Sequence, residues 1–272
     1  CSATCYGRSS STSDYPTSGG PSQYHYQRDW RSLLPLVDFE GAQPLSIEIE
    51  NLSLQLGGVN ILSGVAAQLQ AGSINVLAGP NGAGKTSLLR VLCGELRPNK
   101  GRVLIDGSTL DSFSLEELAK KRCVMTQSTM VVFDFTTLEI LEMSWLFGPK
   151  NKFMDQLEDF CNRCEVMHLI HRTFRSLSGG EKQRVLFVRA LLQVCSQRPA
   201  DGSSQYLFLD EPTSNLDIAH ELTILRVCRE RAAEGFGVVI VLHDLNLASR
   251  FADRILLLQK GELRAVGRPE EV

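Results

Sequence analysis

The chain has 272 residues, of which 43% are hydrophobic and 22% are charged, and its formal net charge is -3. These values are typical of a soluble globular protein with one large domain or two small ones. The small net charge argues against a general affinity for nucleic acid or for an acidic membrane surface. No apolar run approaches the roughly 20 residues of a membrane-spanning helix, so we expect no membrane-spanning helix in this sequence. The eight cysteines lack a framework-like spacing, which favours a reducing compartment.

Residues 1–44 differ from the rest of the chain. They are rich in Ser, Thr, Gly and Tyr and show no periodic apolar pattern. Such a segment cannot bury enough apolar surface to offset the entropy lost on folding, so the composition predicts a disordered tail. Its Ser-rich, acid-poor character also fits an organellar transit peptide. We therefore expect one folded domain over residues 45–272.

Strands and helices alternate through this second part. Residues 46–56 alternate polar and apolar side chains with a period of two, which predicts a half-buried strand. Short apolar runs at 73–79, 206–210 and 238–244 predict buried strands, and the segment "KTSLLRVLCGEL" from Lys85 predicts a helix. This alternation indicates an α/β fold with a mostly parallel sheet, whose ligand site lies at the carboxyl ends of the strands.

The segment "GPNGAGKTS" fits the phosphate-binding pattern G-x-x-x-x-G-K-[ST] and lies between a predicted strand and a predicted helix. Glycines in such a loop let backbone N–H groups turn toward a phosphate, Lys85 reaches the β- and γ-phosphates, and the Thr86 hydroxyl can bind Mg²⁺. A chance glycine turn is the alternative, and the flanking strand and helix argue against it. The residues expected to bind ATP or GTP here are Gly79, Pro80, Asn81, Gly82, Ala83, Gly84, Lys85, Thr86 and Ser87.

Polar side chains also follow two other predicted strands. Asp210 and Glu211 end the run "YLFLDE", where Asp210 would hold Mg²⁺ and Glu211 would take a proton from the attacking water. The alternative is that the two carboxylates are simply exposed to solvent. Carboxylates directly after four consecutive apolar residues seldom serve only to be solvated. His243 could contact the γ-phosphate or the water, and Gln127 suits sensing of Mg²⁺ or water. Taken singly, these two residues carry little signal.

The order of the motifs resembles that of the ATP-binding cassette (ABC) ATPases. In chain order they are the loop 79–86, Gln127, "LSGGEKQR" at 177–184, "LFLDE" at 207–211, "SNLD" at 214–217 and His243. The resemblance covers about residues 45–272. It implies a P-loop NTPase with a RecA-like core, an antiparallel β subdomain and an inserted helical subdomain at about residues 127–185. It also implies ATP and Mg²⁺ as cofactors, with Glu211, His243 and Gln127 in catalysis.

The same resemblance implies Thr86, Gln127 and Asp210 as Mg²⁺ ligands and Asp217 as an ATP contact. Family members usually stack adenine on an aromatic side chain at the position where this chain has Leu56, so base stacking should be weaker here. A nucleotide-dependent scaffold without turnover would lack Glu211 or His243. Since both are present, we expect hydrolysis.

The segment "LSGGE" predicts the start of a helix. Ser178 followed by Glu181 has the spacing of a capping box, in which each side chain accepts a backbone N–H of the other residue. Gly179 and Gly180 keep side chains away, so that these amides and Ser178 can approach a γ-phosphate. A capped helix without a ligand explains Ser178 and Glu181 but not the two glycines. The resemblance implies that this phosphate belongs to ATP on the other subunit of a head-to-tail homodimer.

Within the ABC ATPases the chain is most similar to the haem-import ATP-binding proteins. The similarity rests on "LSLQLGG", "VVFDFTTLEI", "SQRPADGSSQ" and "VLHDLNLASRFADRILLLQKGELRAVG". It implies haem import, a transmembrane permease dimer and an extracytoplasmic substrate-binding protein as partners, no nucleic acid, and a peripheral location on the cytoplasmic side of the inner membrane. Importers of ferric siderophores or cobalamin share "HDLNLA" and are the alternatives. A soluble, non-transport cassette ATPase would be expected to show two cassettes or a long coiled-coil insertion, unlike this sequence.

The stretch "CNRCEVMHLIH", which begins at Cys161, raises the question of a zinc site. On one helix Cys161 and His171 would lie roughly 15 Å apart along the axis, which is too far for ligands of a single zinc ion. We expect this stretch to be a helix that leads to "RSLSGGE", and because its apolar face includes Phe160, the thiols are expected to be core residues. A half-site of Cys164 and His168, completed by another segment or chain, is the remaining alternative.

Overall fold

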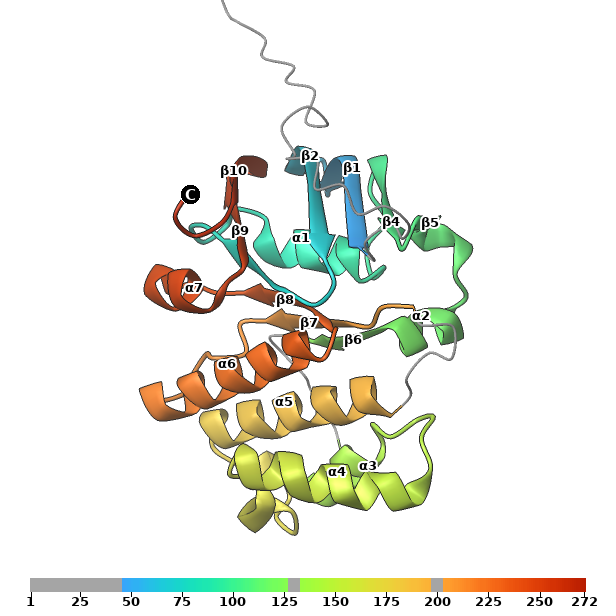
Figure 1. The fold of residues 1–272 in the computed structure, drawn as a ribbon, viewed down its shortest axis with the longest axis vertical. Coiled ribbons are helices and arrows are strands. Elements are labelled where there is room, and N and C mark those ends of the chain that lie inside the picture. The colour runs from blue at the N-terminus through green and yellow to red at the C-terminus, as the bar shows by residue number, and fades with distance from the viewer. Residues whose placement is uncertain (1–45, 127–132, 197–202) are drawn as a thin grey trace, which may run out of the picture. The chain divides into compact units, whose positions relative to one another are not determined.

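A computed structural model describes residues 46–126, 133–196 and 203–272. Its strands form two sheets with helices packed against them (Figure 1). One sheet has four antiparallel strands in the order β2-β1-β4-β5, and the other has six strands in the order β10-β9-β3-β8-β7-β6. The α/β class, the mostly parallel main sheet and the separate antiparallel sheet are confirmed.

The antiparallel sheet begins with the strand that the period-two pattern predicted. Apolar residues of this strand, such as Ile47 and Ile49, are buried, and the polar residues between them are more exposed. Gly57 and Gly58 both have positive φ and form the tight turn to the next strand, as expected of a two-residue hairpin loop. The strands of this sheet are β1 (Ser46–Leu56), β2 (Val59–Gln70), β4 (Lys100–Ile105) and β5 (Ser108–Thr109).

The six-stranded sheet is parallel except for its edge strand β10. Both faces of its central strands are covered, which explains their continuous apolar sequences. The three strands predicted from apolar runs are confirmed, although the last ends at Val241, before His243. The strands are β3 (Ile74–Ala78), β6 (Arg122–Met125), β7 (Tyr206–Asp210), β8 (Gly237–Val241), β9 (Arg254–Gln259) and β10 (Glu262–Gly267).

In Figure 1, helix α1 lies between the two sheets, α5 and α6 lie on the other side of the six-stranded sheet, and α3 and α4 lie beyond α5. The α-helices are α1 (Lys85–Leu92), α2 (Leu115–Lys121), α3 (Thr137–Glu142), α4 (Lys150–Arg163), α5 (Gly179–Cys195), α6 (Ile218–Ala233) and α7 (Leu245–Phe251). Short 3₁₀ helices span Leu110–Ser112, Met167–Leu169 and Phe174–Ser176. The helix predicted from Lys85 ends earlier than expected, because Gly94 takes a left-handed φ of 77° and turns the chain.

Two hydrophobic cores form on the two faces of the six-stranded sheet. Val239 and Val241 of β8 pack into the core that contains α1 and the antiparallel sheet. Val238 and Ile240 point the other way, into the core that contains α4, α5 and α6. The alternation fixes the register of the strand and therefore the position of its carboxyl end.

The prediction that the stretch from Cys161 to His171 is one helix is wrong, because α4 ends at Arg163. The Val166 N–H donates to the carbonyl oxygen of Cys161 at 2.7 Å, and the Glu165 N–H donates to that of Asn162 at 3.2 Å. Glu165 has a φ of 53°. These features define a Schellman ending, with Glu165 at the position usually held by glycine.

The predicted core role of the thiols is confirmed. Cys161 and Cys164 are buried together with Phe160, and burial raises the pKa of both thiols to about 12. His168 lies in the 3₁₀ helix that follows α4. Across the three described ranges, no cluster of three or more His, Cys, Asp or Glu side chains is suited to hold a metal ion.

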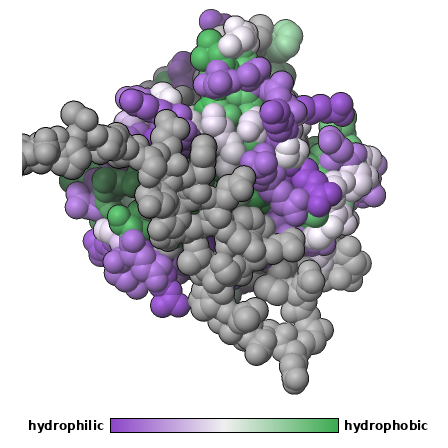
Figure 2. All heavy atoms as spheres, turned by 90° about the horizontal axis from the view of Figure 1, so that it is seen from above, coloured by the Kyte–Doolittle hydropathy of each residue, from purple (hydrophilic) through white to green (hydrophobic). Residues whose placement is uncertain are grey.

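Among the helices of the described residues, none combines the length and the apolar character needed to cross a bilayer. Seen from above Figure 1, the coloured part of the surface carries hydrophilic residues with smaller hydrophobic patches between them (Figure 2). Most large apolar side chains lie inside, while Leu115 and Ile218 are among the exposed ones.

Candidate functional site

The glycine-rich loop follows β3 directly and leads into α1, as predicted. Gly79 has a φ of 137°, and a Cβ atom there would overlap the carbonyl oxygen of Leu258 in β9. Gly84 has a φ of 101°, and its Cβ atom would come within 2.8 Å of Cδ2 of Leu62. Both positions therefore require glycine, because a side chain would be blocked and the backbone is left-handed.

Lys85, the first residue of α1, folds back over this loop. Its Nζ atom donates to the carbonyl oxygens of Gly79 at 2.8 Å and Pro80 at 3.0 Å. Burial lowers the pKa of Lys85, whereas the carboxylates of Glu211 and Asp210 act in the opposite direction. A buried cation at the mouth of a loop lined by backbone N–H groups is suited to bind a phosphate.

Thr86 and Asp210 meet beside the loop. The Thr86 hydroxyl donates to Oδ1 of Asp210 at 3.1 Å, although the two residues belong to α1 and β7. Asp210 is 3% exposed, and burial raises the pKa of its carboxyl while the hydrogen bond from Thr86 opposes this shift. A hydroxyl and a carboxylate are hard oxygen donors of the kind that Mg²⁺ prefers, so these two residues fit a magnesium site.

Glu211 and His243 lie next to each other at the carboxyl ends of β7 and β8. Oε1 of Glu211 is 2.5 Å from Nε2 of His243, and the Glu211 side chain is only 15% exposed. Glu211 has a φ of 51°, which is rare for a residue other than glycine and is typical of functional sites. Gln183 of α5 donates to the backbone carbonyl of Glu211 at 2.8 Å and so helps to stabilise this conformation.

The predicted capping box at Ser178 is confirmed. Ser178 Oγ accepts the N–H of Glu181 at 3.3 Å, and Oε2 of Glu181 accepts the N–H of Ser178 at 2.7 Å. A Cβ atom on Gly180 would lie 2.8 Å from the carbonyl oxygen of Asn215, and one on Gly179 would lie 3.7 Å from Cβ of Asn215. The absent side chains thus let the start of α5 approach the loop that follows Glu211.

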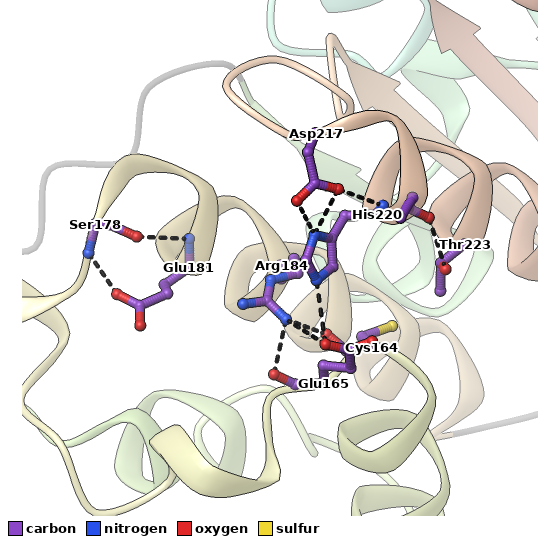
Figure 3. Close-up of polar contacts among 9 residues, drawn as sticks. Cys164, Glu165, Ser178, Glu181, Arg184, Asp217, His220 and Thr223 are labelled. Atoms are coloured by element: carbon purple, nitrogen blue, oxygen red, sulfur yellow. Dashed lines mark hydrogen bonds and ion pairs between the residues drawn. The ribbon is translucent and has the colours of Figure 1, made fainter.

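Asp217 caps α6 and contacts a histidine of the same helix (Figure 3). Its Oδ1 accepts the N–H of His220 at 2.9 Å and also lies 2.9 Å from Nδ1 of the His220 ring. The described side-chain contacts of Ser178 and Asp217 are therefore with residues three positions further along the chain, Glu181 and His220. Leu56, expected to replace an aromatic residue, is 40% exposed at the end of β1. Gln127 lies outside the described residues.

Sequence patterns had not indicated a role for Gln183 or His220. Gln183 is 5% exposed within the run "LSGGEKQR", where a buried amide could have been suspected only from the helical register of α5. His220 follows the Asp217 cap by three residues, the spacing at which a cap accepts a backbone N–H. Its ring contacts both Asp217 and Glu165, and the second of these residues is distant in sequence.

Comparison with known families matches residues 62–214 to the ABC transporter family. The chain belongs to this family. It is 40% identical over 228 residues to the hemin import ATP-binding protein HmuV of Rhizobium meliloti (strain 1021). The aligned region covers 83% of this chain and 87% of the relative. It is 39% identical to the HmuV protein of Pseudoalteromonas translucida (strain TAC 125), over 82% of this chain and 86% of that relative. The similarity to haem-import ATP-binding proteins expected from the sequence is confirmed.

Solved ABC structures share the fold. The ATP-binding subunit of one ABC transporter superposes with a TM-score of 0.71 and 23% identity, covering 82% of this chain and 89% of that one. A bacterial ABC transporter cassette solved as a dimer gives a TM-score of 0.70 and 24% identity, over 82% and 98% of the two chains. The ABC ATPase fold, with its two sheets and its helices, is therefore confirmed.

Proposed function

We propose that this chain is the ATP-binding and ATP-hydrolysing subunit of an ABC importer for haem. The observation that carries the ATPase part is the convergence of Lys85, Asp210, Glu211 and His243 at the carboxyl ends of three neighbouring strands. The haem part rests on relatives named as hemin import ATP-binding proteins, which share about two fifths of their residues with this chain over most of its length.

The loop of residues 79–87 binds the phosphates of ATP. Its glycines leave the backbone N–H groups accessible, and Lys85 exchanges its contacts with two carbonyl oxygens for the β- and γ-phosphates. A phosphate anion next to the Lys85 ammonium favours its charged form and so opposes the burial that lowers its pKa. Thr86 and Asp210, with Gln127, would hold Mg²⁺, which neutralises phosphate charge when bound.

Glu211 is the general base for the attacking water. Its carboxylate is largely shielded from solvent and lies close enough to Lys85 to oppose the burial that lowers the pKa of that residue, so it can accept a proton from a water beside the phosphate loop. His243 contacts this carboxylate through Nε2 and so restricts its orientation. The geometry thus supports activation of the water by Glu211 and positioning of the Glu211 carboxylate by His243.

A second copy of the chain completes the site. Ser178, Gly179 and Gly180 start a helix of 17 residues whose N-terminus is exposed, which suits an approach to the γ-phosphate of ATP on the opposite subunit. Asp217 ends the loop that follows β7 and joins the same interface. The homodimer docks on a transmembrane permease dimer on the cytoplasmic side of the membrane, and a substrate-binding protein delivers haem from outside.

The experiment that tests this function uses the chain assembled with its permease in proteoliposomes. Mg²⁺-ATP turnover is measured with the substrate-binding protein loaded with haem, with a ferric siderophore or with cobalamin. The proposal predicts stimulation by haem alone. Stimulation by the siderophore or by cobalamin would reassign the cargo, and turnover that the permease does not alter would exclude a transport role.

A further inference from the structure

A histidine connects the loop after Glu211 to the end of α4. Nδ1 of His220 lies 2.9 Å from both carboxylate oxygens of Asp217, and Nε2 lies 3.3 Å from Oε2 of Glu165 (Figure 3). The His220 side chain is 22% exposed, whereas those of Asp217 and Glu165 are more than half exposed. The ring therefore occupies a partly buried position between two carboxylates from distant segments, here called the Glu165–His220–Asp217 bridge.

The Glu165 end of the bridge is held firmly. Arg184 of α5 is 8% exposed, and its Nη1 donates to the carbonyl oxygens of Cys164 at 3.0 Å and Glu165 at 2.8 Å. These carbonyls belong to the Schellman ending of α4, where intrahelical partners run out. A buried guanidinium that satisfies both of them fixes the left-handed Glu165 and so fixes the base of its side chain.

The Asp217 end of the bridge lies at the end of the loop that carries Glu211. Gln183, the neighbour of Arg184 on α5, donates to the Glu211 carbonyl, and the Ser214 N–H donates to the same oxygen at 3.1 Å. Asp217 then ends the loop as the cap of α6. The loop is thus fixed to α5 at Glu211 and, through His220, to the end of α4 at Asp217.

We propose that His220 is a positioning residue for ATP hydrolysis, because it fixes the loop of residues 211–217 to the end of α4. This role rests on the proposed ATPase function. The Glu165–His220–Asp217 bridge touches neither the phosphate loop nor Lys85 among its described contacts, so its loss leaves ATP binding by that loop intact and acts on the loop from Glu211 to Asp217. Small displacements of a catalytic group lower the rate strongly, by up to about 100-fold for 1 Å.

The test uses three substitutions at one position. His220→Ala removes the bridge, His220→Asn keeps a nitrogen near the Nδ1 position for Asp217, and His220→Gln keeps one near the Nε2 position for Glu165. Thr223→Ala, one turn further along α6, is the matched control, since the Thr223 hydroxyl donates only to the Ala219 carbonyl. We expect kcat of His220→Ala to fall about tenfold, with KM for ATP within about twofold of wild type. Asn and Gln each restore part of kcat.

A double-mutant cycle with Glu165→Ala separates the bridge from general stability. If the two residues act through one bridge, the double variant loses no more activity than His220→Ala alone. Wild-type kcat in His220→Ala, a KM change equal to the kcat change, or additive losses in the cycle would each overturn the positioning role.

A second measurement does not depend on catalysis. Amide hydrogen exchange of residues 211–217 in the nucleotide-free protein should be about tenfold faster in His220→Ala than in wild type, with Thr223→Ala unchanged. Unchanged exchange overturns the bridge itself. Faster exchange in His220→Ala, together with a wild-type chain that does not hydrolyse ATP with or without its permease, would instead reject the proposed function while keeping the structural role of His220.

Discussion

Nε2 of His243 lies 2.5 Å from Oε1 of Glu211. The two residues follow β8 and β7, which are parallel neighbours in the six-stranded sheet, so their carboxyl ends bring the side chains together. β3 lies on the other side of β8 and ends at the phosphate loop. A carboxylate, its imidazole partner and the loop proposed to bind phosphate thus lie at one edge of the sheet.

Replacement of His243 by Ala should lower the ATP turnover rate by about 10- to 100-fold and leave ATP affinity unchanged, because Glu211 loses the group that orients it. Single-turnover kinetics and ATP binding by calorimetry measure the two effects. His171→Ala, at an exposed position, is the control and should behave as wild type. Full turnover in His243→Ala would contradict the role of the pair.

ATP should stabilise the chain through Lys85. At an ATP concentration of 100 times Kd the free energy of unfolding rises by about 2.7 kcal/mol, which corresponds to a Tm increase of about 5 to 10 °C. Lys85→Ala should abolish this increase, while the exposed Lys152→Ala keeps it. Tm is measured by differential scanning fluorimetry. An ATP-dependent Tm increase of wild-type size in Lys85→Ala would show that another group binds the phosphates.

Gly79→Ala should destabilise the protein and prevent ATP binding, because its Cβ atom would overlap the carbonyl oxygen of Leu258. Gly107→Ala is the matched control, since Gly107 also has a positive φ but no atom lies within 4 Å of a Cβ there. We expect the control to lose about 1 kcal/mol and Gly79→Ala about 3 kcal/mol or more in urea unfolding. Equal losses would mean that backbone strain alone explains Gly79.

Buried thiols should make the protein sensitive to alkaline pH. The pKa of Cys161 and Cys164 is raised from 9.0 to about 12 by burial, so in the window between these values the unfolded chain ionises its thiols and the folded chain does not. Their contribution to stability is complete below pH 9 and is lost as the pH rises toward 12, by about 1.4 kcal/mol per pH unit for each thiol. The double variant Cys161→Ala, Cys164→Ala should show a shallower loss in urea unfolding between pH 9 and 10.5. An identical slope in the two proteins would contradict burial of the thiols.

Local sequence signals were sufficient where one short segment determines the structure. The period-two pattern correctly predicted β1, and the apolar runs correctly predicted β3, β7 and β8. The spacing of Ser178 and Glu181 correctly predicted the start of α5. The approach of Asp210 to the phosphate loop was expected from the two segments together, because parallel strands present their carboxyl ends at one edge of a sheet.

Signals failed where the structure depends on distant contacts. The end of α4 was missed because Glu165 takes the left-handed position without being glycine, and the buried Arg184 that satisfies the terminal carbonyls lies on another helix. His220 was missed because its partner Glu165 lies just after the end of α4, where the periodic apolar pattern had predicted that the helix continues. Neither feature has a signature within its own segment.

The most direct test of the ATPase account is Mg²⁺-ATP turnover by the purified chain, alone and with its permease, for wild type and Glu211→Gln. The exposed Glu262→Gln in β10 is the control. We predict that Glu211→Gln lowers turnover by at least about 100-fold while ATP binding is retained, and that the control is unchanged. Turnover that survives in Glu211→Gln would contradict the assignment of Glu211 as the general base.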